Sequence, residues 1–212
     1  MEKNSFNFTL IDHPLVKCDI TLLRDKKTQT EIFRSAVRRL SNILAVEINK
    51  DLKLKIINVE TPLEKTKGYK LDEDIVLVPV LRAGLSMVNG FLDVIPDCNV
   101  GHIGLQRDEE TLLPIEYYFK IPALKKNSKV ILLDPMLATG GSASEALKYL
   151  NKKGAKKIIF ACLVAAPEGI KKLNKKHPGV KIFGTALDRE LNEKGYILPG
   201  LGDAGDRTFG TL

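Results

Sequence analysis

The chain has 212 residues, of which 44% are hydrophobic, and it carries a formal net charge of +7. This length suffices for one domain with a sizeable core. No apolar stretch approaches the ~20 residues that cross a membrane. The opening residues, MEKNSFNFTLIDHP, lack the apolar segment of a signal peptide. We therefore expect one domain, residues 1–212, of a soluble cytoplasmic protein.

The cysteines and lysines exclude several classes of function. Cys18, Cys98 and Cys162 lack the paired spacing of a disulfide framework or a zinc site. The lysines occur in scattered pairs, such as Lys152-Lys153, without interleaved aromatic residues, so no RNA-binding pattern is present. We favour solvated helix faces for most of them, although the charge of +7 also suits a polyanionic substrate.

The first fifty residues offer one strong helical signal. Residues 4–27 have few periodic features, and His13, which precedes a proline, is more often structural than catalytic in such a context. Thr28 to Glu31 has the spacing of a capping box. Apolar residues then recur at helical spacing at Phe33, Val37, Leu40 and Leu44. This pattern predicts an amphipathic helix that packs on the core or on a partner subunit.

The remainder alternates between apolar runs and helical patterns. Residues 54–59 predict a strand, and residues 61–74 an irregular polar connection. Short apolar runs at 75–80, 100–105, 130–133, 157–166 and 180–186 are typical of buried strands. The alternation predicts an α/β fold with a parallel sheet flanked by helices. Ligands of such folds bind at the carboxyl ends of the strands.

Two arginines follow such strands. Arg82 offers forked donors that suit phosphate oxygens, and Gly84 permits a close backbone approach. A lone surface arginine beside a turn is the alternative. Arg107 follows the next strand, and its alternative is an exposed pairing with the acidic residues 108–110.

The stretch Val130 to Glu145, VILLDPMLATGGSASE, contains the strongest candidate site. An apolar run is stopped by Asp134-Pro135, and a glycine-bearing turn leads into a helical pattern. Gly140 and Gly141 let backbone N–H groups point inward, Thr139 and Ser142 add hydroxyls, and the helix N-terminus attracts negative charge. This geometry suits one phosphate group. The alternative is a plain capping box from Ser142 to Glu145.

The C-terminal segment contains a misleading motif. Gly200 to Gly205 matches GxGxxG, but Pro199 precedes it, and too few residues follow for a crossover helix and a returning strand. We therefore reject a dinucleotide site. A glycine-rich closing loop instead exposes backbone donors and acceptors that can read the edge of a small planar ligand.

These stretches together carry a family resemblance. Residues 134–142, DPMLATGGS, resemble the phosphoribosyl-pyrophosphate (PRPP) loop of the uracil phosphoribosyltransferases, a branch of the type I phosphoribosyltransferases. Residues 81–84 are similar to the pyrophosphate loop of that family, residues 112–122 to its flexible arm, and residues 195–206 to its uracil-binding hood. Most type I enzymes have two adjacent acidic residues where this chain has Asp134-Pro135, and this departure is typical of the uracil branch. The resemblance extends from His13 to Thr211.

The resemblance implies an activity and a set of site residues. The reaction is the transfer of the 5-phosphoribosyl group from PRPP to uracil, which gives UMP and diphosphate. Arg82, Arg107 and Asp203 are the implied catalytic residues, and the uracil-binding residues are Ile197, Gly202, Asp203 and Ala204. The implied PRPP-binding residues are Arg82, Arg107, Asp134, Pro135, Met136, Leu137, Ala138, Thr139, Gly140, Gly141, Ser142 and Asp203.

The resemblance also implies an architecture and partners. A base-binding hood is expected from about residues 190–212 plus the N-terminal segment, with an N-terminal helical arm. Mg²⁺ is the expected cofactor, held mainly through diphosphate and water rather than by protein ligands. A homo-oligomer of two or more chains is expected, GTP is compatible as an effector, and neither a membrane nor a nucleic acid is an expected partner.

Two other functions stay open on the residues alone. A purine phosphoribosyltransferase keeps the phosphate loop but needs a different hood, and a panel of nucleobases distinguishes it. An RNA-binding regulator on the same fold uses the positive charge, and RNA filter binding in moderate salt distinguishes it. Fold analogy does not separate these functions, whereas the C-terminal hood favours uracil.

Overall fold

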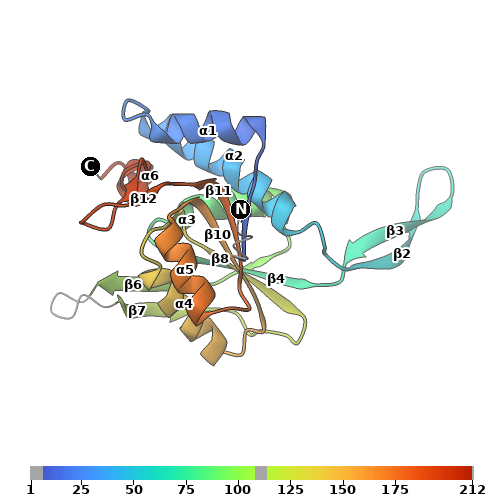
Figure 1. Ribbon diagram of the computed structural model, residues 1–212. Helices are drawn as coiled ribbons and strands as arrows, with labels where there is room; N and C mark the ends of the chain where they lie inside the picture. Colours follow the sequence, from blue (N-terminus) through green and yellow to red (C-terminus); the bar gives the residue numbers. More distant parts are fainter. Residues whose placement is uncertain (1–6, 108–113, 212) are drawn as a thin grey trace, which may run out of the picture.

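The computed structural model describes residues 7–107 and 114–211 (Figure 1). The helices are α1 (Pro14–Arg24), α2 (Thr30–Ile48), α3 (Leu85–Val94), α4 (Gly141–Lys152), α5 (Pro167–Lys176) and α6 (Ala204–Phe209). The strands of the main sheet are β1 (Phe8–Leu10), β4 (Asp74–Leu81), β5 (Asn99–Val100), β6 (His102–Arg107), β7 (Pro114–Lys120), β8 (Ser128–Leu133), β9 (Met136–Leu137), β10 (Lys157–Ala165) and β11 (Lys181–Leu187). Two small antiparallel pairs lie outside it, β2 (Leu54–Glu60) with β3 (Lys65–Leu71) and β12 (Glu190–Leu191) with β13 (Ile197–Leu198).

The main sheet is predominantly parallel. Its order is β1-β11-β10-β8-β4-β6-β7, and the β6–β7 pair is antiparallel. β8 pairs with β4 from Asp74↔Ser128 to Pro79↔Leu133, and β4 pairs with β6 at Val80↔Ile103. The three strands that precede the candidate site loops are therefore direct neighbours.

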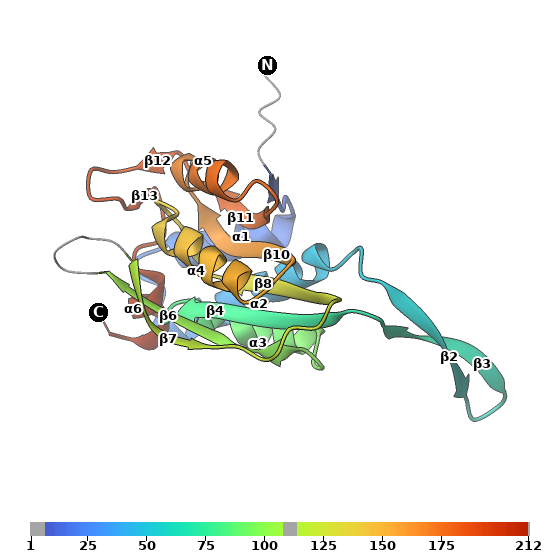
Figure 2. The same ribbon diagram turned by 90° about the horizontal axis from the view of Figure 1, so that it is seen from below.

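The core lies on both faces of this sheet, because successive side chains of a strand point to opposite faces. Leu77 and Ile131 point to the face covered by α1, α2 and α3, where Phe33 and Phe91 are buried. Val78 and Leu132 point to the opposite face, which α4 and α5 cover. Figure 2 shows α4 and α5 side by side on that face. The predicted α/β architecture with a flanked parallel sheet is confirmed.

The helical stripe on α2 is confirmed, but the predicted capping box before it is wrong. Phe33, Val37, Leu40 and Leu44 are all buried in the core. The N-cap of α2 is Gln29, which makes no side-chain capping bond, so Thr28 lies outside the helix. Upstream, residues 14–24 form α1, and the Nδ1 atom of His13 accepts a hydrogen bond from Leu15 N, a structural role for this histidine.

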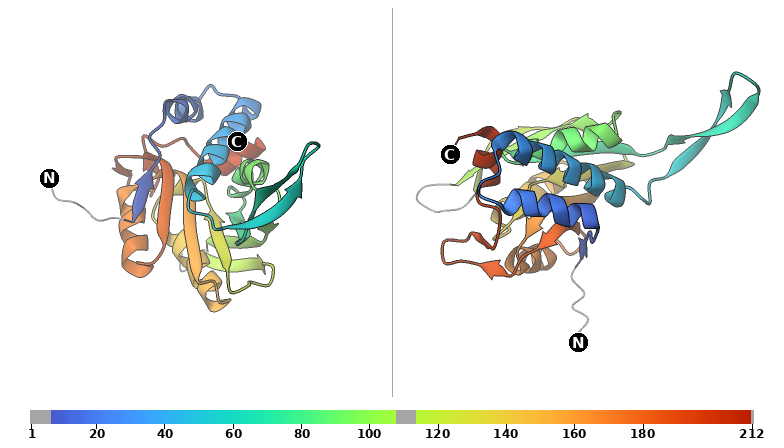
Figure 3. Two further views of the ribbon diagram at one scale, coloured as in Figure 1. Left: turned by 90° about the vertical axis from the view of Figure 1, so that its right-hand side faces the viewer. Right: turned by 90° about the horizontal axis from the view of Figure 1, so that it is seen from above.

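The expectation of an irregular connection over residues 61–74 is also wrong. Residues 65–71 form β3, which pairs with β2 in a hairpin that projects from the rest of the chain (Figure 3). The run KTKGYKL has no apolar alternation because both faces of the hairpin are exposed, so burial leaves no trace in its sequence. Within the described part of the chain, no helix is long and apolar enough to cross a bilayer.

Candidate functional site

Three loops meet at one edge of the sheet. Arg82 follows β4, Arg107 ends β6, and Asp134 follows β8. Because these strands are parallel neighbours, their carboxyl ends lie at the same edge, where ligands of such sheets bind. The structure thus brings the backbone of all three predicted positions together. The side chain of Arg107 and residues 108–113, which include the first two residues of the predicted arm, lie outside the described residues. The next part of that arm forms β7 (Pro114–Lys120).

The glycine-bearing loop opens α4 without a side-chain cap. Gly140 is the N-cap residue, with a left-handed φ of +70°, and Ser142 lies inside the helix. The capping-box alternative for Ser142 and Glu145 is therefore wrong, and Glu145 instead pairs with Lys148 at 2.7 Å. The side chains of Thr139 and Ser142 are exposed. The Thr139 hydroxyl oxygen accepts a long hydrogen bond of 3.4 Å from Gly141 N. A helix N-terminus whose N-cap residue has no side chain, with two exposed hydroxyls beside it, is a suitable site for an anion.

Helix α5 supports this loop from behind. A Cβ atom on Gly169 would lie 2.4 Å from the carbonyl oxygen of Ala138, so the backbones pack at a distance that only glycine allows. A Cβ atom on Gly140 would lie 3.1 Å from the carbonyl oxygen of Gly169. The loop conformation is thus fixed by backbone packing rather than by side chains.

Asp134 is a carboxyl with a strongly altered acidity. Burial raises its pKa to about 7, the hydrogen bond from Met136 N opposes that increase, and the negative charge of Asp203 adds to it. The charge of Asp203 therefore acts on the carboxyl group of Asp134. This coupling joins the phosphate loop to the C-terminal segment.

The C-terminal segment forms one wall of a cavity of about 460 Å³. The opposite wall is supplied by Met136 and Ala138 of the phosphate loop. Lining residues from the C-terminal segment are Lys194, Gly195, Tyr196, Ile197, Pro199, Gly200, Leu201 and Gly202. Two predicted base-reading residues, Ile197 and Gly202, thus line the cavity. The other two predicted uracil-binding residues, Asp203 and Ala204, are not among its lining residues. Asp203 is the N-cap of α6, and Ala204 begins that helix with its side chain buried in the core.

Arg82 also contacts the C-terminal segment. Its guanidinium donates to Asp206 Oδ1 at 3.1 Å, and its side chain is 59% exposed. The side chain of Thr211 and the Arg82 charge hold the pKa of the Asp206 carboxyl below its usual range. Gly84 packs against the sheet, because a Cβ atom there would lie 2.4 Å from the carbonyl oxygen of Leu133. The close approach predicted at Gly84 is therefore to a neighbouring strand.

Asp203 is the N-cap of α6. Its Oδ1 atom accepts a hydrogen bond from Asp206 N at 2.9 Å, which is a structural capping role. The same carboxylate affects the pKa of Asp134. Asp203 therefore combines a structural contact with an electrostatic one.

Sequence reasoning missed three charged residues around this site. Arg24, Asp188 and Arg207 hold the segment that follows β13, through hydrogen bonds described below. Arg207 and Asp188 are buried. Burial is what marks a charged residue as structurally important, and burial is not visible in the sequence. The sequence therefore offered no pattern that identifies these three residues.

Comparisons with known proteins agree with this geometry. The sequence model of the uracil phosphoribosyltransferase family matches residues 10–211 of this chain. The uracil phosphoribosyltransferase of Malacoplasma penetrans is 54% identical over 95% of this chain and 98% of its own length, and that of Salinibacter ruber is 51% identical over 97% and 98%. A solved protein from Aquifex aeolicus is 41% identical with a TM-score of 0.90, over 95% of this chain and 97% of that one.

A more distant structure defines the class. The adenine phosphoribosyl transferase of Trypanosoma brucei is only 13% identical, yet it aligns over 88% of this chain and 85% of its own with a TM-score of 0.59. The fold is that of the type I phosphoribosyltransferases. Within that class, the chain belongs to the uracil phosphoribosyltransferase family.

Gly140→Ala tests the phosphate loop. We expect PRPP affinity to fall about tenfold, equivalent to one lost N–H bond, because the new Cβ atom forces the loop away from Gly169. Gly154→Ala is the matched control: its φ is +86°, and nothing lies within 4 Å of the added atom. Isothermal titration calorimetry with PRPP compares the two. Equal affinities in both variants would contradict the assignment.

Asp134 predicts a pH-dependent stability. Its folded pKa of about 7 lies above the unfolded value of about 3.9. Between these values the folded chain binds a proton that the unfolded chain lacks, so stability falls as pH rises from about 4 to about 7, by up to about 1.4 kcal/mol per pH unit. Asp134→Asn removes this contribution. Urea unfolding from pH 4.5 to 8 measures it, and parallel curves for the two proteins would contradict it.

Proposed function

We propose that this chain catalyses the transfer of the 5-phosphoribosyl group from PRPP to uracil. The observation that carries the proposal is the cavity of about 460 Å³, whose two walls are the phosphate loop and the C-terminal hood. A base in this cavity lies beside the loop that binds the sugar phosphate. Nucleophile and electrophile are thereby held next to each other, which is the main requirement of the reaction.

The chemistry depends on positioning and electrostatics. The bond between C1′ and diphosphate loosens, positive charge builds on the ribose, and uracil N1 forms the new bond as diphosphate leaves. Residues 139–142 bind the 5′-phosphate, and Arg82 and Arg107 hold diphosphate. For Arg82 this requires an exchange of partner from Asp206 to the substrate. Asp134 and Asp203 face the sugar, where their negative charge stabilises the developing positive charge.

Mg²⁺ fits this arrangement as the cofactor. Within the described residues, no three His, Cys, Asp or Glu side chains gather as a metal site. Mg²⁺ usually keeps several waters and binds through one or two carboxylates plus substrate phosphates. Asp134 and Asp203 are two such carboxylates, and the charge of Asp203 acts on Asp134. The ion would neutralise charge on diphosphate.

Several finer expectations stay predictions. They are the cytoplasmic location, the single domain with its hood over residues 190–212 and the N-terminal segment, and GTP as an effector. The purine alternative and the RNA-binding alternative retain the tests given above. No observation on the described residues favours either of them over uracil.

A homo-oligomer is supported by the β2–β3 hairpin. Leu54 pairs with Leu71 and Ile56 with Tyr69, so these four side chains share one face. All four are exposed, Ile56 by 63% and Tyr69 by 69%. An isolated two-stranded hairpin is marginally stable, and an exposed apolar patch of this kind marks an interaction surface. We propose that a second copy of this chain packs against this apolar face of the hairpin.

The decisive experiment is an assay with radiolabelled uracil, PRPP and Mg²⁺. We expect labelled UMP to form with uracil, and far less product with cytosine, hypoxanthine or adenine. Cytosine presents an amine and a ring acceptor where uracil presents O4 and N3–H, so buried backbone groups would lose their partners. Equal use of uracil and cytosine would overturn the assignment of the hood.

Asp203→Asn tests the electrostatic role of this residue. The amide keeps the capping bond to Asp206 N but removes the charge, so we expect turnover to fall about 10- to 100-fold with uracil affinity nearly preserved. Asp97→Asn is the control, because Asp97 is an exposed loop aspartate between α3 and β5. Steady-state kinetics measures both. Wild-type turnover in Asp203→Asn would leave this residue with a capping role alone.

Ile56→Lys tests the hairpin as an oligomer contact. We expect the variant to sediment as a smaller species than the unmodified protein at equal concentration, because a lysine on the apolar face stays unpaired when buried. Leu15→Lys, at a position 61% exposed on α1, is the matched control and keeps the original size. Analytical ultracentrifugation measures the mass. A monomeric unmodified protein would contradict the homo-oligomer.

A further inference from the structure

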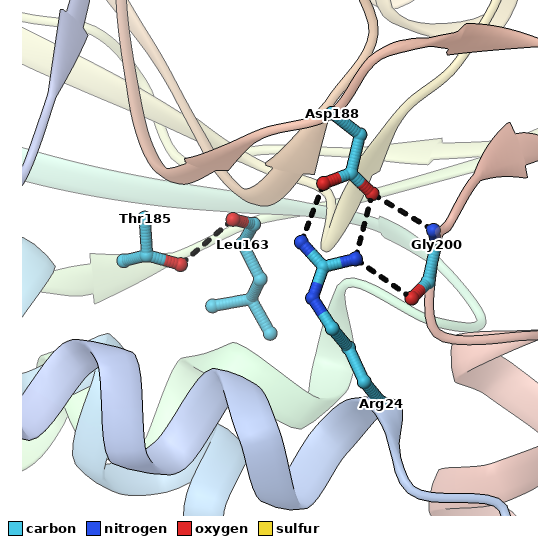
Figure 4. A network of polar contacts seen from close by, with 5 residues as sticks. All are labelled: Arg24, Leu163, Thr185, Asp188 and Gly200. Carbon is cyan, nitrogen blue, oxygen red and sulfur yellow. Dashed lines mark hydrogen bonds and ion pairs between the residues drawn. The ribbon is translucent and has the colours of Figure 1, made fainter.

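An ion pair holds both backbone polar groups of Gly200 (Figure 4). Arg24, the last residue of α1, donates to the two carboxylate oxygens of Asp188 at 3.0 and 2.5 Å. The same arginine donates to the carbonyl oxygen of Gly200 at 3.0 Å, and Asp188 accepts from Gly200 N at 2.9 Å. The Asp188 side chain is 2% exposed. A buried, bidentate pair with these additional bonds is a rigid attachment point.

Gly200 itself has little freedom to move. Its φ is +62°, and a Cβ atom there would lie 2.3 Å from the carbonyl oxygen of Ile197. The turn between these residues is therefore tight. Both of them line the candidate base cavity, whereas Arg24 and Asp188 are not among its lining residues. The ion pair therefore holds a residue of the cavity wall without lining the cavity itself.

A second arginine, Arg207, binds the backbone of Leu201, the residue after Gly200. Arg207 of α6 donates to the carbonyl oxygen of Leu201 at 2.8 Å. It also donates to the carbonyl oxygens of Leu23 and Asp25, the latter at 2.6 Å, at the end of α1. Its guanidinium lies over the Phe33 ring at 4.5 Å. Two arginines thus join the end of α1 to the loop at residues 200–201. Arg24 lies on α1 and bonds to the loop, and Arg207 lies on α6 and bonds to both.

These contacts determine which backbone groups of the loop remain for a ligand. The N–H and C=O of Gly200 and the C=O of Leu201 are all engaged. Among the hydrogen bonds of the described residues, neither Leu201 N nor Gly202 N is a donor. Within the part of the chain that the structure describes, the N–H groups of Leu201 and Gly202 and the carbonyl of Gly202 thus stay available in two residues that line the cavity. A planar ligand with ring carbonyls and a ring N–H matches such a set.

We propose that Arg24 and Asp188 are positioning residues that set the base specificity of the cavity by fixing the backbone of residues 200–202. The pair touches no substrate, so it acts through the loop. The inference rests on the proposed function, because that function assigns the cavity to the base. Errors in donor position of even about 1 Å reduce rates strongly in preorganised sites, which makes the pair a determinant of selectivity rather than of fold alone.

The test uses a double variant, Arg24→Met with Asp188→Asn. Removing Arg24 alone would leave a buried carboxylate unpaired and risks unfolding, whereas the double variant leaves no uncompensated charge. The matched control is Arg39→Met with Asp19→Asn. That pair is also bidentate and also involves α1, with the Asp19 side chain 9% exposed, but its hydrogen bonds do not reach the loop.

Two measurements are made on each full-length protein. The first is hydrogen exchange of peptides that cover residues 197–204, which needs no activity. We expect protection there to fall about tenfold or more in the Arg24/Asp188 variant and to stay unchanged in the control. The second is steady-state kinetics: KM for uracil and the preference for uracil over cytosine change about tenfold, while KM for PRPP stays within about twofold.

The outcomes separate this inference from the proposed function. Unchanged exchange at 197–204, or equal changes in both double variants, would overturn the positioning role even in an active enzyme. A parallel rise in KM for uracil and for PRPP would also overturn it, since that result indicates a general loss of structure. If the unmodified protein forms no UMP while exchange changes as expected, the proposed function fails and the loop attachment stands.

Discussion

The adjacency of β8, β4 and β6 is the constraint on which the site depends. These three neighbouring strands are parallel and end at one edge of the sheet, so the loops that follow them lie next to each other at that edge. The N-terminus of α4, the guanidinium of Arg82 and the backbone of Arg107, the last residue of β6, all lie at this edge. The positions of these groups are thus determined by the apolar strands that precede them.

Close backbone packing then converts this placement into a rigid site. The Arg82 loop is pressed against β8, because Gly84 leaves no room for a Cβ atom beside Leu133 O, and the phosphate loop is pressed against α5 at Gly169 in the same way. The hood lacks such an extended sheet behind it. Its rigidity depends on side chains instead, namely the arginines that join residues 200–201 to the end of α1.

This difference explains what the sequence could and could not predict. Apolar runs indicate the buried strands, and glycines and hydroxyls indicate the loop at residues 134–142. The sheet, the helices that flank it and the phosphate loop could therefore be predicted. The Arg24–Asp188 contact joins residues 164 apart, and nothing local marks either of them as a partner. Strand β2 was predicted from residues 54–59, but β3 was missed for a related reason, because burial imposes no alternation on a strand that is exposed on both faces. The capping-box alternative at Ser142 is wrong because a left-handed glycine, Gly140, is the N-cap of α4 and places this serine inside the helix.

In the proposed function, the carboxyl groups of Asp134 and Asp203 lie beside the reacting sugar. A site for a polyanionic substrate gains nothing from fixed negative charge unless a cation also enters it. Burial and the neighbouring charge of Asp203 raise the pKa of Asp134 to about 7, so near neutral pH this carboxyl is about half protonated and its repulsion of the phosphates is reduced. In the proposed reaction, positive charge that develops on the ribose would favour the ionised form of Asp134. The attraction would then be stronger for the transition state than for the bound substrate, and an interaction of that kind accelerates the reaction rather than only tightening binding.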